Sequence, residues 1–95
     1  MELEYTAVAI EWRGPAPFVF LPVPPDGSAM IAELAPELTY GWGAIPAEAT
    51  IGGTTFTTSL FPRDGAYLLP IKVAVQRAEG VGVGDRVTAR MRLGR

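Results

Sequence analysis

The central stretch of the chain, residues 45–60, has the sequence IPAEATIGGTTFTTSL and decides the fold class. Two alternating runs flank Gly52-Gly53, a two-residue linker suited to a type I′ or II′ turn. If Ile51 pairs with Thr54, one face of the two strands is mostly apolar and the other polar, as a half-buried β-hairpin requires. The predicted pairs are Ile51–Thr54, Ala49–Phe56, Ala47–Thr58 and Ile45–Leu60 on the apolar face, and Thr50–Thr55 and Glu48–Thr57 on the polar face.

Further strands are predicted on both sides of this hairpin. Glu4 to Trp12 alternates, and we expect its inner side to hold Thr6, Val8, Ile10 and Trp12. Short apolar strands follow at 18–21 and 66–69, and Phe61-Pro62 is expected to end the strand before the second of these. The last strand alternates Val87, Ala89, Met91 and Leu93 with Arg86, Thr88, Arg90 and Arg92.

Two helices are predicted between these strands. The first follows Pro24-Pro25, with Asp26 or Ser28 as N-cap, and Pro36 is expected to end it near Ala35. Its expected buried stripe is Met30, Ile31 and Leu34. The second is expected to start at Pro70 and to end before Gly80, a natural C′ residue. Its expected inner face is Ile71, Ala74, Val75 and Ala78.

The two halves of the chain share one order of elements: strand, strand, Leu-Pro, helix, strand. Leu21-Pro22 matches Leu69-Pro70 at an offset of 48, which also sets Val8 on Phe56 and Trp12 on Leu60. The 95 residues suit one domain, 1–95. We therefore predict a mainly β fold, a small closed or split β-barrel of about six to seven strands capped by two short helices, with a pseudo-two-fold relation between its halves.

Composition argues against several kinds of chemistry. The chain has no cysteine and no histidine, so disulfides, thiolate nucleophiles, Cys-based zinc sites and histidine proton transfer are excluded. Gly80-Val81-Gly82-Val83-Gly84 follows a helix and precedes a strand, the reverse of a phosphate-binding loop, so a helix cap and turn explain it. We expect no enzyme activity, no metal site and no cofactor.

The start of the chain is acidic and lacks the basic and apolar regions of a signal peptide, and no apolar run spans a bilayer. We expect a cytoplasmic protein with no membrane contact, present as a monomer or weak dimer.

Several strings resemble one known family. They are residues 50–62 (TIGGTTFTTSLFP) with 65–72 (GAYLLPIK), the early Phe18-Val19-Phe20-Leu21-Pro22 and the late Gly84-Asp85-Arg86-Val87. Together they resemble the bacterial and archaeal domain-of-unknown-function family 1905 (DUF1905) over nearly the whole chain. The resemblance implies a small β-barrel with helices at its ends and carries no established activity. The C-terminal part also resembles the half-barrel of AbrB/MazE-type DNA-binding proteins.

Aromatic and basic residues near the turns are the candidate binding residues. Trp42 lies between two glycines and, with Tyr40, Tyr67, Trp12 and Phe18, could line a pocket or a partner surface; alternatively it plugs one end of the barrel. The leading hypothesis is a non-catalytic barrel that binds a small ligand or a protein partner. Its candidate residues are Trp42, Tyr67, Arg63 and Lys72.

Two alternatives remain open. Arg86, Arg90 and Arg92 share one face of the last strand, and a nucleic-acid-binding regulator would place such a face on phosphates. The net charge of −2 argues against a nucleic-acid partner, and we favour pairing with Glu2, Glu4 or Glu11, on a first strand lying beside the last, as the explanation of these arginines. The other alternative is a purely structural or fusion module.

Overall fold

The computed structural model describes residues 1–12, 18–38 and 44–94. The central hairpin consists of β4 (Ile45–Ile51) and β5 (Thr54–Arg63). Its register confirms the predicted pairs, from Ile51 opposite Thr54 to Ile45 opposite Leu60. Gly52 has a φ of +58° and Gly53 is not in the left-handed region, the pattern of a type II′ turn.

The strand β5 continues past its expected end, through Phe61-Pro62 to Arg63. Asp64 (φ +50°) and Gly65 (φ +79°) then form a two-residue turn into β6 (Ala66–Pro70). Pro62 is tolerated inside the strand because it lies in the part of β5 that has left β4 and pairs with β6 alone. This extension places Phe61 and Arg63 on the outside of the barrel.

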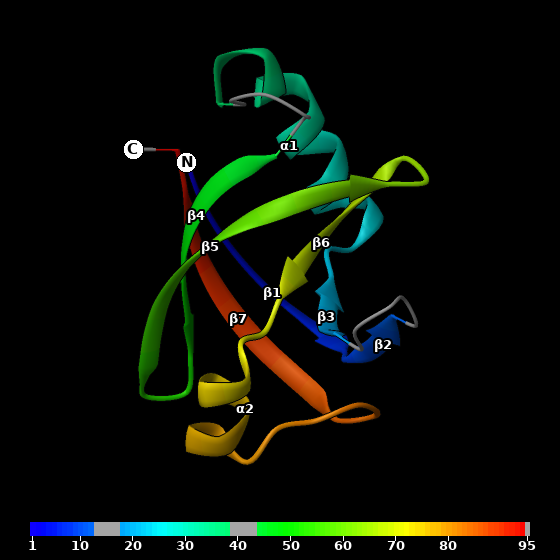
Figure 1. Cartoon of the computed structure of the whole chain (residues 1–95). Coiled ribbons are helices and arrows are strands. Elements are labelled where there is room, and N and C mark those ends of the chain that lie inside the picture. The colour runs from blue at the N-terminus through cyan, green and yellow to red at the C-terminus, as the bar shows by residue number, and fades with distance from the viewer. Residues whose placement is uncertain (13–17, 39–43, 95) are drawn as a thin grey trace.

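The remaining strands are β1 (Glu2–Val8), β2 (Ile10–Trp12), β3 (Phe18–Pro22) and β7 (Arg86–Leu93). The order in the sheet is β1-β7-β4-β5-β6-β3-β2, with every described pairing antiparallel. The two outermost strands, β1 and β2, follow one another in sequence with only Ala9 between them. The sheet therefore curls until its two ends meet in one bent N-terminal segment, which gives the barrel-like shape in Figure 1.

The expected inner side of the N-terminal strand is wrong. Tyr5 and Ala9 are buried, whereas Val8, Ile10 and Trp12 are exposed. The Ala9 backbone joins the turn before β7: its N–H donates to the Asp85 carbonyl and its carbonyl accepts from the Gly84 N–H, both at 2.9 Å. The segment carries apolar residues on both sides, so alternation alone could not decide which side faces the core.

The helix α1 (Pro25–Leu38) covers one end of the barrel, and it runs through Pro36 instead of ending near Ala35. Pro36 cannot donate a backbone hydrogen bond and its ring crowds the carbonyl one turn earlier, and α1 ends two residues after it. Of the expected stripe, Ile31 is buried but Met30 and Leu34 are exposed, because the helix caps the barrel end and does not lie along a sheet.

Ser28 is not an N-cap. It lies inside α1, where its buried hydroxyl donates to the Val23 carbonyl and accepts the Tyr67 N–H. These two hydrogen bonds fix the start of the helix to β6.

The helix α2 (Val73–Glu79) covers the opposite end, and its expected start at Pro70 is wrong. Pro70 is the last residue of β6, and the chain stays extended because the Ile71 N–H donates to the Val19 carbonyl at 2.9 Å. Val75 is the buried residue of α2, and the expected inner positions Ala74 and Ala78 are exposed. The C-cap at Gly80 is confirmed, with a φ of +64°.

The end of α2 holds the tip of the central hairpin. The Glu79 carboxylate accepts hydrogen bonds from the Gly53 N–H and the Thr54 hydroxyl. The positive φ of Gly52 favours glycine at this position, and a Cβ there would lie 1.9 Å from Glu79 Oε1 and would displace this carboxylate from the hairpin tip.

The barrel interior is filled by residues of β1, β3, β4, β5, β6 and β7, whereas the three residues of β2 are exposed. The predicted alternation of β7 is confirmed, since Val87, Ala89, Met91 and Leu93 are buried and the residues between them exposed. The largest fully buried side chains are Leu21, Ile31, Ile45, Leu60, Leu69 and Met91.

The arrangement of the halves agrees with the internal repeat. The strands β3 and β6, and the starts of α1 and α2, are each 48 residues apart in sequence. Leu21 lies opposite Leu69 in the β3–β6 ladder, so each residue pairs with its own equivalent. The same offset fails on the N-terminal strand, where it matches exposed Val8 to buried Phe56 and exposed Trp12 to buried Leu60.

Candidate binding face

Large apolar side chains gather on the outside of the barrel, over β2, β3, β6 and the end of β5. The ladder places Trp12 opposite Phe18, Ile10 opposite Phe20, Phe20 opposite Pro70, and Phe61 opposite Leu68. Alternation along each strand directs all of these residues to the outer side. We call this surface the aromatic face; its members are Ile10, Trp12, Phe18, Phe20, Phe61, Leu68 and Pro70, of which Leu68 is buried and Phe20 and Pro70 are half-buried.

Much of the aromatic face is open to solvent. Phe18 is 55% exposed, Phe61 47%, Ile10 41% and Trp12 37%. Isolated exposed apolar residues are ordinary on protein surfaces, but a contiguous set on adjacent strands marks an interaction surface.

Two shallow hollows lie on this face. The first, of about 210 Å³, is lined by Trp12, Phe20, Phe61, Pro62, Arg63 and Leu68. The second, of about 250 Å³, is lined by Phe18, Val19, Pro70, Ile71, Lys72, Val73 and Gln76. The rings of Phe18 and Phe20 lie between the hollows, with centroids 6.1 Å apart and planes tilted by 43°. The two hollows therefore adjoin along β3.

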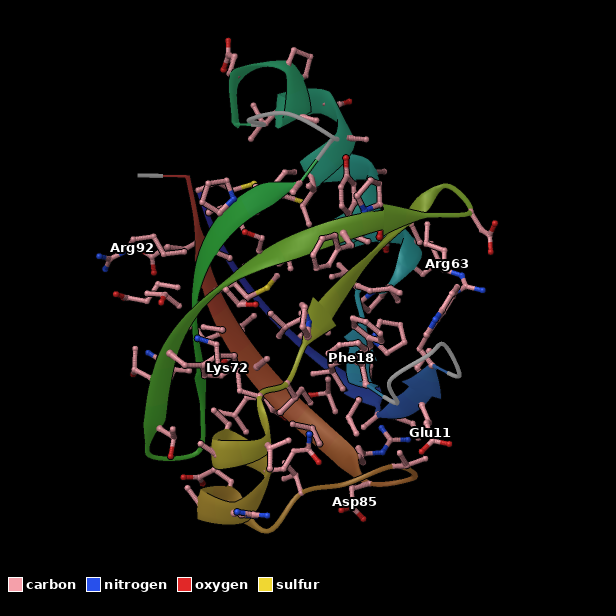
Figure 2. All side chains as sticks on the ribbon, viewed as in Figure 1. Glu11, Phe18, Arg63, Lys72, Asp85 and Arg92 are labelled. Carbon is pink, nitrogen blue, oxygen red and sulfur yellow. The ribbon has the colours of Figure 1, made fainter. Side chains whose placement is uncertain are left out.

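Arg63 lies across the first hollow and fixes one of its walls. Its guanidinium carbon is 3.2 Å from the centroid of the Trp12 ring, a close cation–π contact. Its Nε donates to Asp64 Oδ2 at 3.4 Å, the long limit of a hydrogen bond. Figure 2 shows Arg63 and Phe18 on one side of the barrel and Arg92 on the other.

The candidate residues taken from the sequence fall in three places. Arg63 lines the first hollow and Lys72 the second. Tyr67 is buried on the inner side of β6, away from the aromatic face, because it alternates with outward Leu68. Trp42, together with Tyr40, lies outside the described residues.

Sequence reasoning did not assign Phe61, Phe20 or Ile10 to the site. Phe61 was expected at a strand end, and Ile10 was expected inside the barrel. The signal for them is the outward alternation of β2 and β3, which becomes visible only once Tyr5 and Ala9 are known to be the inner residues.

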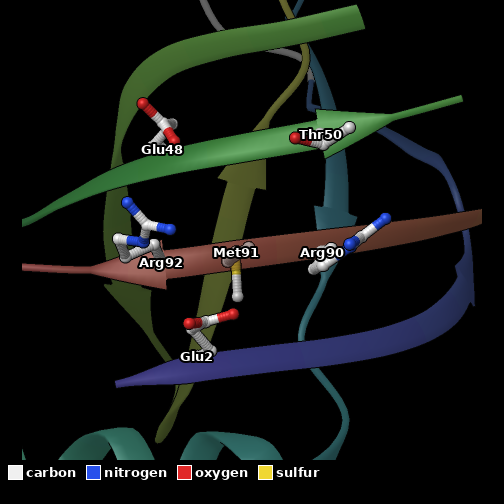
Figure 3. A pocket seen from close by; sticks show the side chains of 6 residues that line it. All are labelled: Glu2, Glu48, Thr50, Arg90, Met91 and Arg92. Carbon is white, nitrogen blue, oxygen red and sulfur yellow. The ribbon is translucent and has the colours of Figure 1, made fainter. Parts of the chain in front are cut away.

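The opposite side of the barrel is charged. Outward residues of β7 lie between β1 and β4, so that Arg92 stands opposite Glu2 and Glu48, and Arg90 opposite Glu4 and Thr50. The prediction that the first and last strands lie side by side is confirmed. We call this surface, formed by Glu2, Glu4, Glu48, Thr50, Arg90 and Arg92, the charged face. Figure 3 shows Arg92 between the two carboxylates, beside a hollow of about 240 Å³.

Tyr5, a buried titratable residue, links the β1 side of the barrel to the β3 side through the interior. The Tyr5 hydroxyl on β1 donates to the Leu21 carbonyl on β3 at 2.9 Å. Burial raises the pKa of this phenol above its ordinary value, because the phenolate loses its hydration. Tyr5 is a neutral structural donor at physiological pH.

Within the described ranges, no three His, Cys, Asp or Glu side chains come together as metal ligands would. The helices among these residues are too short, or not apolar enough, to cross a bilayer.

Comparison with known proteins identifies the family of the chain. Curated proteins yield no significant match. The family model for a domain of unknown function, DUF1905, matches residues 5–91, which run from β1 to β7 and include every residue of the aromatic face. The resemblance carried by the central and flanking strings is therefore confirmed, and the chain belongs to the DUF1905 family.

Proposed function

We propose that this domain is a non-catalytic binding module that docks a protein partner on the aromatic face. The observation that carries the proposal is the set of exposed apolar side chains on adjacent strands: Ile10, Trp12, Phe18 and Phe61. Covering them would remove apolar surface from water at about 25 cal/mol per Å². Trp, Phe and Arg are also the residue types enriched at protein interfaces.

The shape of the face favours a protein over a small molecule. Its hollows, of about 210 and 250 Å³, are smaller than the roughly 300–1,000 Å³ of sites that enclose drug-sized ligands. Two adjoining shallow hollows suit two neighbouring side chains of one partner segment. A small ligand would remain largely exposed in either of them.

Composition supports a binding role over catalysis. The chain has no histidine and no cysteine, so the commonest proton-transfer group and the most reactive nucleophile are missing. The residues that line the two hollows are apolar apart from Arg63, Lys72 and Gln76.

The nucleic-acid alternative has weaker support. Phosphate binding needs a face with excess positive charge. On the charged face, Glu2 and Glu48 flank Arg92, and Glu4 flanks Arg90. Among the described residues, Ile10, Trp12, Phe18 and Phe61 of the aromatic face are not covered in a comparable way, so we place the partner there.

Site-specific photo-crosslinking in host cells tests the proposal. Benzoylphenylalanine at position 61 should yield an adduct with one protein, and the adduct should weaken when Phe18 is also changed to Ser. Position 57, exposed on the same strand β5 but remote from the aromatic face, is the matched control and should yield no such adduct. Equal adducts at both positions, or none at 61, would contradict the proposal. An adduct of twice the chain mass would show that the partner is a second copy of this chain.

A further inference from the structure

We propose that the segment docked on the aromatic face presents a carboxylate to Arg63, beside a large apolar side chain that fills the first hollow. The inference rests on the proposed function and names the chemistry of the partner. It comes from the way Arg63 is held and from the charges around both hollows.

Arg63 is oriented before any ligand arrives. Its guanidinium lies 3.2 Å above the Trp12 ring, and stacking uses the flat face of the group. All guanidinium N–H donors point outward in the plane of the group, so stacking leaves this edge available for hydrogen bonds. An arginine held in this way can receive a carboxylate with two parallel hydrogen bonds at little entropic cost.

The present partner of Arg63 is a weak one. Asp64 meets the guanidinium at Nε at 3.4 Å, whereas charge-assisted hydrogen bonds are about 2.7–2.9 Å long. The Asp64 side chain is 89% exposed, so water screens the contact. A ligand carboxylate could bind the guanidinium better than Asp64 does.

Charge around the hollows favours an anion. The described residues that line the two hollows include Arg63 and Lys72 and no acidic residue, although the whole chain has a net charge of −2. Glu11 lies between Ile10 and Trp12 on β2 and so alternates to the other side of that strand. The described ionisable side chains that line the hollows are therefore basic, and a ligand carboxylate would meet Arg63 and Lys72 there.

The apolar requirement comes from the first hollow itself. Five of its six lining residues are apolar, and Arg63 is the sixth. A ligand that fills this hollow therefore places its polar end next to the guanidinium. The C-terminal carboxylate of an apolar residue, or an Asp or Glu beside one, has this chemistry.

NMR titration of the isotope-labelled protein tests the inference with two probes that differ only in charge. N-acetyl-phenylalanine carries a carboxylate and N-acetyl-phenylalaninamide does not. We expect the acid to bind about fivefold to tenfold more tightly, with shifts at the Trp12 indole and the Leu68 amide, and a smaller difference at high salt. Acetyl-Asp-Phe-amide, in a third titration, distinguishes a side-chain carboxylate from a C-terminal one.

Two variants make the test specific. Arg63→Gln should abolish the difference between acid and amide while the amide still binds. Asp64→Asn should tighten binding of the acid, because it removes the competing carboxylate, and Asn tolerates the φ of +50° at this position. Equal binding of acid and amide to the unaltered protein, or no shift with any probe, would overturn the inference. The crosslinking at position 61 tests whether a protein partner binds the aromatic face, and its result does not depend on whether that partner presents a carboxylate.

Discussion

The outer surface of the barrel differs between its two sides, although both are built from the outward residues of alternating strands. On the charged face Arg90 and Arg92 each have a glutamate opposite them, which balances their charge, whereas Arg86 at the start of β7 lies opposite Val8. On the aromatic face the outward residues are Ile10, Trp12, Phe18 and Phe61, and they remain in contact with water. The charged face is suited to contact with water. Covering the aromatic face would lower the free energy, because it removes apolar side chains from water.

The strongest test of this difference uses two consecutive residues of β5. Leu60 is fully buried and Phe61 is half exposed. Leu60→Ala should lower the free energy of unfolding by about 2–5 kcal/mol, because it leaves a cavity in the core. Phe61→Ser should cost less than about 1 kcal/mol. Urea unfolding of both variants measures the two values, and comparable losses would make the aromatic face part of the core.

The link between the two sides can be tested through Tyr5. Its folded-state pKa is raised, so the folded protein binds the phenolic proton more tightly than the unfolded chain does. The stabilisation is complete below the unfolded pKa of about 10 and is lost above it, at up to about 1.4 kcal/mol per pH unit. We expect the wild type to lose about 1 kcal/mol more than Tyr5→Phe between pH ~9 and pH ~11.

Urea unfolding across this range provides the measurement for Tyr5. Because Tyr5→Phe also removes the hydrogen bond to Leu21, only the slope against pH is compared, and not the absolute stability. Parallel pH profiles of the two proteins would show that the pKa of Tyr5 is the same in the folded and the unfolded state, which would contradict the prediction.

The smallest effect is expected on the charged face. Arg90 and Arg92 are exposed and lie opposite glutamates, and attraction between exposed charges contributes at most about 1 kcal/mol per pair. Replacing both with Gln should change the free energy of unfolding by less than about 2 kcal/mol, and added salt should reduce the difference further. The same double variant should leave the adduct at position 61 unchanged. Loss of that adduct would mean that both sides of the barrel take part in binding.

The parts of the fold that could be predicted are those in which only one face of an element is apolar. The β4–β5 register and the inner residues of β7 follow from strict alternation. The same argument predicted the wrong inner side for the N-terminal strand, because its inner residues include small ones such as Ala9 and its outer residues include large ones such as Trp12. The residues of the aromatic face are apolar, so the sequence pattern predicts them inside the barrel.

Proline and tertiary hydrogen bonds account for the other errors. Pro36 and Pro70 both suggested helix boundaries, yet α1 runs through the first and β6 includes the second. The bond from the Ile71 N–H to the Val19 carbonyl keeps the chain extended, and it joins residues that are far apart in sequence. Arg63 and Lys72 were nominated for their proximity to turns, whereas the contact of Arg63 with Trp12 depends on the β3–β6 pairing, which joins β2 and β3 to β5 and β6.

The closure of the barrel through β1 and β7 has a consequence for the order of folding. Glu2 pairs with Arg92, so this ladder joins the two ends of the described chain. The β4–β5–β6 meander forms between neighbours in sequence, but β1 has no partner until β7 has been synthesised. Loop closure over most of the chain is slow in comparison with hairpin formation. During synthesis the aromatic residues of β2 and β3 therefore leave the ribosome before the strand that completes the barrel exists.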